Sequence, residues 1–162
     1  MLPYWILIAP IVFVLDQLSK WIVVAWLTSL DMPYWMVTDF FNIVLVYNKG
    51  VSFGMLAQEH GWAIFLMGSL AWVVGGVLIW LARGSSSWER WGYCLIAGGA
   101  WGNGLDRFVH GGVVDFLDFH VQGWHFWAFN VADIGISMGV MLLLISSLGL
   151  LPSRDGEKQH DE

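Results

Sequence analysis

The sequence predicts an all-α membrane protein with four transmembrane helices and a small extracytoplasmic β-unit formed by the first and third connections. Composition is the first reason: 57% of the 162 residues are hydrophobic and 12% are charged, whereas an ordinary soluble domain has roughly 25% charged residues. The second reason is length, because several apolar stretches each approach the roughly 20 residues that a helix needs to cross a bilayer. These stretches cover residues 4–27, 62–82, 91–108 and 131–151.

The whole chain, 1–162, is expected to form a single integral membrane domain. Its first apolar stretch differs from a cleaved signal peptide, because nothing basic precedes it and no small-residue cleavage site follows it. It also contains Asp16 and Lys20. We therefore expect this stretch to be retained as a transmembrane helix.

The basic residues outside the helices predict how the chain is oriented. Arg83 and Arg90 flank the second connection, and further basic residues lie in the tail, residues 152–162. Cytoplasmic loops are enriched in Lys and Arg, so both termini and this connection should face the cytoplasm. The outer loops, residues 30–60 and 110–130, should then lie on the opposite side of the membrane.

Both outer loops contain strand patterns. The β-rich run from Phe40 to Tyr47 leads into the turn signal Asn48-Lys49-Gly50 and then into Val51-Ser52-Phe53, which predicts a β-hairpin. In the third connection, residues 113–121 alternate like a strand. Together these segments predict a small β-unit above the helices.

Several function classes are disfavoured by composition. The net charge of −6 and the scattered Lys and Arg residues argue against a nucleic-acid binder. The single cysteine, Cys94, cannot build a disulfide framework, and no His-Glu-x-x-His motif indicates a zinc protease. We interpret His120 and His125 as ordinary polar or interfacial residues, because no carboxylate or cysteine partner has ligand spacing. No metal or cofactor is predicted.

Polar residues inside the apolar stretches need a reason, because ionisable groups are costly in a membrane. Asp16 and Lys20 are spaced i, i+4 and can pair, either as a structural ion pair or as part of a site. For Asp106 and Arg107 the simpler interpretation is local pairing and extension of the arginine to the interface. Asn103 needs a partner on a neighbouring helix or a ligand.

Two further carboxylates indicate chemistry. Strand alternation places Asp115 on an apolar face, which suggests a functional site. Asp133 begins the fourth helix, where Asn130 is a suitable N-cap, so a capping role alone would explain it. The third connection starts and ends near these aspartates and could bring them together. Two close carboxylates tend to share a proton, as in aspartic proteases.

Five motifs in chain order resemble the lipoprotein signal peptidase family, the signal peptidase II type of membrane aspartic protease. The resemblance covers nearly the whole chain. The motifs are Asp16-Gln17-Leu18-Ser19-Lys20, Asn48-Lys49-Gly50-Val51-Ser52-Phe53-Gly54, Gly98-Gly99-Ala100-Trp101-Gly102-Asn103-Gly104-Leu105-Asp106-Arg107, Val113-Val114-Asp115-Phe116 and Phe129-Asn130-Val131-Ala132-Asp133.

The resemblance implies an aspartic endopeptidase that removes the signal peptide from diacylglyceryl-modified bacterial prolipoproteins, cleaving just before the lipidated cysteine. It implies that Asp115 and Asp133 are catalytic. The other site residues that it implies are Asn48, Gly50, Asn103, Arg107 and Asn130 for substrate binding, with Asp16, Lys20 and Asp106 in support. The expected location is the bacterial inner membrane, with the site near the outer face. The expected partners are substrate and membrane lipid, with no nucleic acid and no obligate protein partner.

The chain departs from the family pattern at three positions. Ser19 replaces the commoner threonine, Gly104 stands in place of a larger apolar residue and could loosen the third helix, and Trp127 occupies a place often held by proline. None of these residues is a catalytic carboxylate, so activity is still expected. The shape of the loop around Trp127 could differ.

Three other functions compete with the peptidase. A small polytopic transporter or proton channel would use the ionisable residues as a polar path, but the second apolar stretch contains none. An intramembrane aspartyl protease of another type needs Gly-x-Gly-Asp, and here Leu105 separates Gly104 from Asp106. A non-enzymatic scaffold would leave Asp115 on an apolar strand face unexplained.

Overall fold

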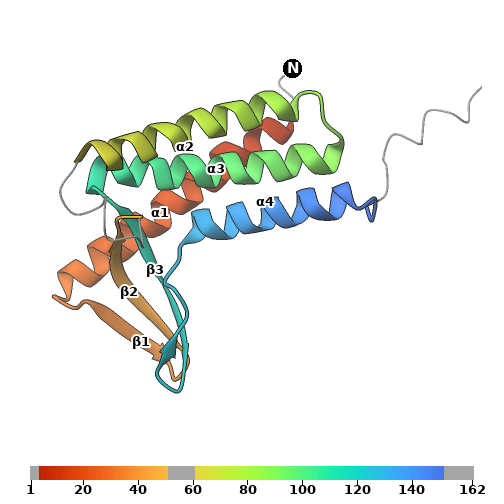
Figure 1. Ribbon diagram of the computed structural model, residues 1–162. Helices are drawn as coiled ribbons and strands as arrows, with labels where there is room; N and C mark the ends of the chain where they lie inside the picture. Colours follow the sequence, from red (N-terminus) through yellow and green to blue (C-terminus); the bar gives the residue numbers. More distant parts are fainter. Residues whose placement is uncertain (1–3, 51–60, 152–162) are drawn as a thin grey trace, which may run out of the picture.

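The computed structural model describes residues 4–50 and 61–151, and in this part of the chain helices form a bundle from one end of which a sheet projects (Figure 1). A 3₁₀ turn, Tyr4–Leu7, leads into the first helix. The predicted strand at 51–53 and the predicted tail at 152–162 lie outside the described residues. The helices are α1 (Ile8–Ser29), α2 (Gly61–Ala82), α3 (Ser87–His110) and α4 (Val131–Ser147).

The helices differ in how well they match a membrane span. Within the described residues, Tyr4–Ser29 and Gly61–Ala82 are long and apolar enough to cross a membrane. Helix α3 has 24 residues but carries charged residues near both ends. Helix α4 is apolar but has 17 residues, a length of about 26 Å at 1.5 Å per residue.

Turn and capping residues explain why the boundaries of two helices differ from the predicted ones. The third segment, expected at 91–108, begins at Ser87 because Ser86 and Glu89 form a capping box, and it ends at His110, followed by the cap residue Gly111, whose φ is 69°. The fourth segment, expected to reach 151, ends at Ser147, and the chain turns at Gly149, whose φ is 68°.

Small residues allow α3 to lie at the centre of the bundle, packed against α1, α2 and α4. A Cβ atom at Gly99 would collide with the backbone of Ala132, and one at Gly102 would collide with the carboxylate of Asp16. Helix α3 continues without a break through Gly104, where a Cβ would lie 2.9 Å from Trp72 Cδ1. The glycines therefore serve close helix packing.

The described strands form one antiparallel arrangement in the order β1-β2-β3-β4. Strand β2 confirms the predicted run before Asn48, and β3 confirms the predicted alternating segment. The described partners of β2 are β1 and β3, and β1 was not predicted. The register places Asn48 opposite Val113. The strands are β1 (Tyr34–Thr38), β2 (Phe41–Asn48), β3 (Val113–Val121) and β4 (Trp124–His125).

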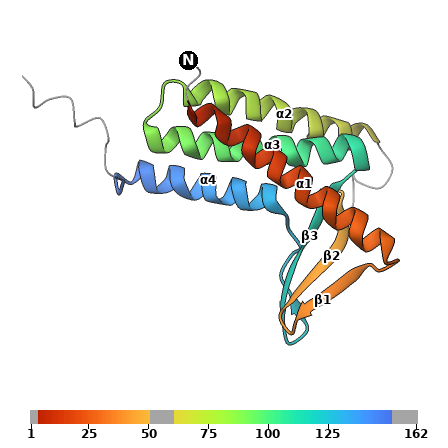
Figure 2. The same ribbon diagram turned by 180° about the vertical axis from the view of Figure 1, so that it is seen from behind.

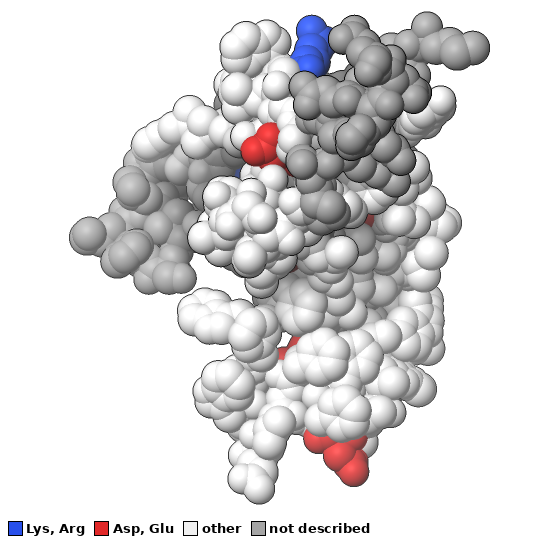
Figure 3. All heavy atoms as spheres, turned by 90° about the vertical axis from the view of Figure 1, so that its right-hand side faces the viewer, with Lys and Arg blue, Asp and Glu red and all other residues white. Residues whose placement is uncertain are grey.

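The two ends of the bundle carry different structure. Both ribbon views place the start of α1, the connection between α2 and α3 and the end of α4 at one end, and the sheet at the other (Figures 1 and 2). On the face seen in Figure 3, most described atoms belong to uncharged residues, and charged residues form a few separate spots. Large apolar side chains are exposed along α1, α2 and α4, which fits a surface that contacts lipid.

Candidate active site

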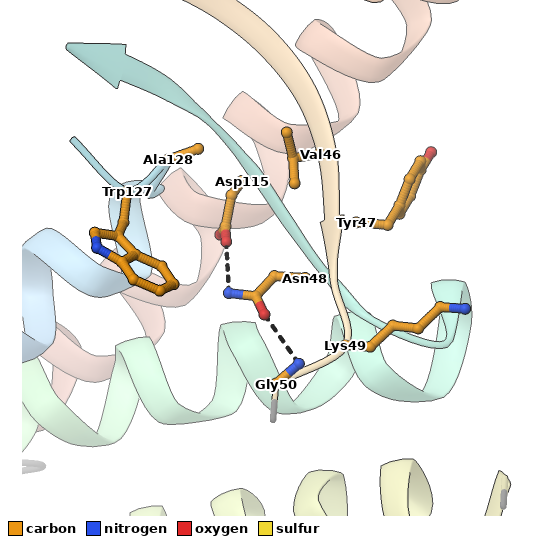
Figure 4. A pocket seen from close by; sticks show the side chains of 8 residues that line it. All are labelled: Val46, Tyr47, Asn48, Lys49, Gly50, Asp115, Trp127 and Ala128. Atoms are coloured by element: carbon orange, nitrogen blue, oxygen red, sulfur yellow. Dashed lines mark hydrogen bonds between the residues drawn. The ribbon is translucent and has the colours of Figure 1, made fainter. Parts of the chain in front are cut away.

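Asp115 lies near the start of β3, where strand and helical bundle meet, and is only 2% exposed. Its two carboxylate oxygens accept hydrogen bonds from side-chain amides, one from Asn48 Nδ2 at 2.9 Å and one from Asn130 Nδ2 at 2.7 Å. Figure 4 shows Asn48 extending from the end of β2 toward Asp115. The pairing of β2 with β3 therefore brings the first of these amides to the carboxylate.

Asp133 lies in the first turn of α4 and is half-buried. As the sequence predicts, it takes part in the N-terminal cap: Oδ2 accepts the backbone N–H of Asn130 at 3.1 Å. Its other oxygen, Oδ1, accepts Asn103 Nδ2 at 2.9 Å. Capping is thus only part of its role, because α3 also supplies a donor to the same carboxylate.

Asn130 connects the two aspartates. Its Nδ2 donates to Asp115 Oδ1, and its Oδ1 accepts the backbone N–H of Asp133 at 3.1 Å. The side chain is fully buried, and its amide also lies 3.2 Å from Val114 O and from Asn103 Oδ1. One amide group therefore orients both carboxylates at once.

Arg107 and Gly50 lie beside this pair. Arg107 Nη1 donates to Asn103 O at 2.8 Å, and the guanidinium is close enough to interact with the charges of Asp115 and Asp133. Gly50 has φ of +83° and donates its N–H to Asn48 Oδ1 at 2.9 Å. A Cβ at Gly50 would lie 3.3 Å from Arg107 Nη2, so the backbone passes close to the arginine.

Asp16, Lys20 and Asp106 form a buried ionic network beneath the site. Lys20 Nζ lies 2.7 Å from Asp16 Oδ2 and 2.8 Å from Asp106 Oδ2, and it donates to Asn103 Oδ1 at 3.0 Å. The interpretation of Asp106 as a locally paired residue is wrong, because its cationic partner is on α1. Close approach of α1 and α3 at Gly102 makes this contact possible.

The network is bonded to the backbone next to each aspartate of the pair. Asp16 Oδ1 accepts the N–H of Ala132 at 2.9 Å, one residue before Asp133. Asp106 Oδ2 accepts the N–H of Val114 at 3.0 Å, one residue before Asp115. The buried charges therefore help to fix the positions from which both carboxylates project.

Gln17 belongs to the same network and was not predicted. Its Nε2 lies 2.9 Å from Asp106 Oδ1, 3.1 Å from Asp16 Oδ2 and 3.2 Å from Gly102 O. The signal was present in the sequence, because an amide at this depth in an apolar stretch needs partners as much as Asn103 does.

Burial is the main influence on the acidity of Asp115. It raises the pKa of this carboxyl to about 6, and the negative charge of Asp133 adds to the effect, while hydrogen bonds from Asn48 and Asn130 oppose it. Such a pKa allows the group to hold a proton near the pH at which cells work. A perturbed carboxyl beside an open cavity is a frequent mark of an active site.

Two cavities open beside the aspartates. One, of about 500 Å³, includes Asp115 and Asn48 in its lining (Figure 4). The other, of about 410 Å³, includes Asp133 and runs along the first turns of α4. In residues 4–50 and 61–151, no group of three or more His, Cys, Asp or Glu side chains is arranged to hold a metal ion. The reactive groups beside these cavities are two carboxyl groups, with side-chain amides and a guanidinium group as neighbours.

Comparisons with known proteins agree with this arrangement. A family model described as signal peptidase (SPase) II matches residues 8–149. The chain is 44% identical to a lipoprotein signal peptidase of Cupriavidus necator over 89% of its own length and 82% of the relative. It is 45% identical to one from Aeromonas hydrophila, covering 87% and 86% of the two chains, and 43% identical to one from Coxiella burnetii, covering 92% and 91%.

Solved structures give the same result at the level of the fold. One bacterial membrane enzyme matches with a TM-score of 0.74 and 29% identity, covering 91% of this chain and 94% of its own. A second matches with a TM-score of 0.70 and 27% identity, covering 100% and 95%. With a family model spanning nearly the whole chain and relatives above 40% identity, the chain belongs to the signal peptidase II family.

Proposed function

We propose that this chain is an aspartic endopeptidase that uses Asp115 and Asp133 to cleave diacylglyceryl-modified prolipoproteins just before the lipidated cysteine. Its family removes signal peptides from prolipoproteins. The observation that carries the proposal is the side chain of Asn130, which donates to one carboxylate and accepts the backbone N–H of the other. Two carboxylates oriented by one amide beside open cavities suit activation of a water molecule.

Different surroundings assign different roles to the two aspartates. Asp133 lies at the N-terminus of α4, where its Oδ2 accepts a backbone N–H, and its side chain is more exposed than that of Asp115. Asp115 has neutral amide donors and a pKa raised to about 6 by burial. We therefore assign the base to Asp133 and the acid to Asp115.

The reaction then follows from these protonation states. Asp133 takes a proton from a water molecule, and the oxygen of that water forms a bond to the scissile carbonyl carbon. When the carbon–nitrogen bond breaks, Asp115 gives its proton to the departing amine. The pair starts and ends with one proton between its two carboxyls. Asn48, Gly50, Asn103 and Arg107 would hold the peptide backbone and the developing negative charge.

The membrane arrangement is part of the proposal. All four described helices cross the inner membrane, both termini are cytoplasmic, and the site faces the outer side. The arrangement of the bundle supports this, because the start of α1 and the connection between α2 and α3 lie at the end opposite the sheet (Figure 1). A maleimide that cannot cross membranes should label Asp39→Cys in intact cells but Ser85→Cys only after permeabilisation. The reverse pattern would overturn the orientation.

Substrate cleavage tests the catalytic assignment. Purified protein in detergent is incubated with a diacylglyceryl-modified prolipoprotein, and the shift on a gel is compared among wild type, Asp115→Asn and Asp133→Asn. We expect each variant to lose at least about a thousandfold in rate. Asp118→Asn is the matched control, because it removes a buried carboxylate from the same strand outside the pair. Normal cleavage by a folded Asp115→Asn or Asp133→Asn protein would show that the residue is misassigned.

A further inference from the structure

Trp127 lies between the two cavities, and each cavity contains one aspartate of the pair. Trp127 and Ala128 line both cavities. On one side the lining includes Asp115 together with the polar end of β2, from Asn48 to Gly50. On the other side it includes Asp133 and mostly apolar side chains. These are Phe126, Phe129, Ile134 and Met138, with Ser137.

The Trp127 side chain is 76% exposed although it lines both cavities beside the aspartates. In Figure 4 the indole lies beside the hydrogen-bonded pair Asp115 and Asn48. Within the described part of the chain, no hydrogen bond or ring contact holds the indole. Its neighbours are different: Phe126 and Phe129 contact each other at 6.0 Å between ring centroids. The indole is therefore available to pack against something outside the chain.

The backbone on both sides of Trp127 is nevertheless fixed. Phe126 donates its N–H to Phe119 O at 2.7 Å, and Phe129 donates to Leu117 O at 3.1 Å. Leu117 returns a bond to Phe129 O at 2.9 Å. An aromatic side chain projected from a fixed backbone loses little conformational entropy on binding, so it is a suitable anchor for a ligand.

The apolar cavity is continuous with the lipid-facing side of α4. Ile134 and Met138 line it and are 40% and 58% exposed. A diacylglyceryl group is attached to the residue next to the scissile bond, so its chains start within a few ångströms of the aspartates. They need an apolar route from there into the bilayer, and the cavity between Trp127 and α4 provides one.

We propose that Trp127 is a specificity-determining residue that packs against the diacylglyceryl chains of the substrate where they leave the aspartate pair along α4. This inference rests on the proposed function, since it requires the scissile bond to lie between Asp115 and Asp133. The indole separates the polar cavity, which takes the peptide, from the apolar cavity, which takes the lipid. Its contribution is to substrate affinity, and the chemical step stays with the carboxylates.

Cleavage of two matched substrates tests the inference. Both carry the same peptide, one with long and one with short acyl chains. We expect Trp127→Ala to raise KM for the long-chain substrate by roughly tenfold, the effect of losing one large apolar contact, with kcat changed less than about threefold. For the short-chain substrate the rise in KM should be clearly smaller, and Trp127→Phe should lie between. Trp80→Ala, which removes an indole that is 66% exposed on α2, is the control and should behave like wild type.

Binding in an inactive background separates this inference from the proposed function. In the Asp115→Asn protein, Trp127→Ala should raise Kd for the long-chain substrate by the same factor as KM in the active protein. An equal loss for both chain lengths would show that Trp127 contacts the peptide, and no loss would show that it contacts neither; each result overturns the inference. Continued cleavage by Asp115→Asn would instead overturn the catalytic assignment while leaving the binding result interpretable.

Discussion

Two buried carboxylates on β3 have opposite properties although only two residues separate them. Asp115 is 2% exposed and Asp118 is 5% exposed. Burial raises the pKa of Asp115 to about 6. Burial also acts to raise the pKa of Asp118, but hydrogen bonds from His125 and Asn42 and the charge of the histidine outweigh it, so that the pKa is lowered.

The partners of the two carboxylates explain the difference. Asp115 accepts two neutral amides and lies near another negative charge, whereas Asp118 lies 2.9 Å from His125 Nδ1 and accepts Asn42 Nδ2 at 3.0 Å. Neutral amide donors do not offset the burial of Asp115, whereas the hydrogen bonds from His125 and Asn42 lower the pKa of Asp118. Asp118 thus links β4 to β3 through His125, and Asp115 remains available for proton transfer. Burial alone does not identify a catalytic acid.

The largest difference between Asp115 and Asp118 should be in kcat, when the amide that bonds to each carboxylate is removed. Asn130→Ala should lower kcat by more than about a hundredfold, because both aspartates lose their common partner. Asn42→Ala removes the corresponding amide from Asp118 and should leave kcat within about threefold of wild type. Cleavage rates of the two variants in the same detergent provide the measurement. Equal losses in both would mean that the amides act only through stability.

The pH dependence of stability should also distinguish Asp115 from Asp118. Because the pKa of Asp115 is raised in the folded protein, this carboxyl ionises at a lower pH in the unfolded chain than in the folded one. It therefore lowers the free energy of unfolding progressively between about pH 4 and pH 6. Asp115→Asn lacks this cost. Between pH 4 and pH 8, the free energy of unfolding of the variant relative to wild type should therefore rise by about 3 kcal/mol, the equivalent of two pKa units. Thermal unfolding across this range measures it, and a constant difference would contradict the raised pKa.

Asp118 should show the opposite sign. Its pKa is lowered, so its stabilising contribution is present above the pKa of the unfolded chain and is lost as the pH falls. Asp118→Asn should lower the free energy of unfolding at pH 7 by about 1–3 kcal/mol, since it weakens a buried charge-assisted contact. The deficit should shrink below about pH 4. A deficit that grows on acidification would show that Asp118 does not stay ionised.

The smallest effect is expected at His125, the exposed partner of Asp118. His125 is 55% exposed in its contact with Asp118. Glutamine can still donate one hydrogen bond, so His125→Gln should cost about 0.5–1 kcal/mol at pH 7. Cleavage should remain near the wild-type rate. A loss of activity as large as that expected for Asn130→Ala would place His125 in the catalytic site.

The helices were predictable because apolar length is a property of the sequence itself. Their exact ends depended on capping: the box of Ser86 and Glu89 extends α3, and Gly149 follows the early end of α4. Strand β1 was missed because all of Tyr34–Thr38 is exposed, so no alternation marks it. Its existence depends on pairing with β2, which short-range patterns do not contain.

Part of the site could also be predicted. Strand alternation singled out Asp115, and the helix start singled out Asp133. The bridge through Asn130 could not be derived from spacing, because it requires β3, α3 and α4 to meet at one point. The contact of Lys20 with Asp106 likewise depends on how closely α1 and α3 approach. The resemblance to the family named these residues without supplying their geometry.

We propose that Asp115 supplies a proton and Asp133 removes one, so the pH dependence of kcat/KM should reveal the ionisation of Asp115. This ratio reports the ionisation of the free enzyme. Because burial raises the pKa of Asp115 to about 6, kcat/KM should fall above about pH 6 as this acid loses its proton. Asp118→Asn should show the same profile as wild type. If kcat/KM is independent of pH from 5 to 8, or if its alkaline limb moves in Asp118→Asn, Asp115 is not the proton donor.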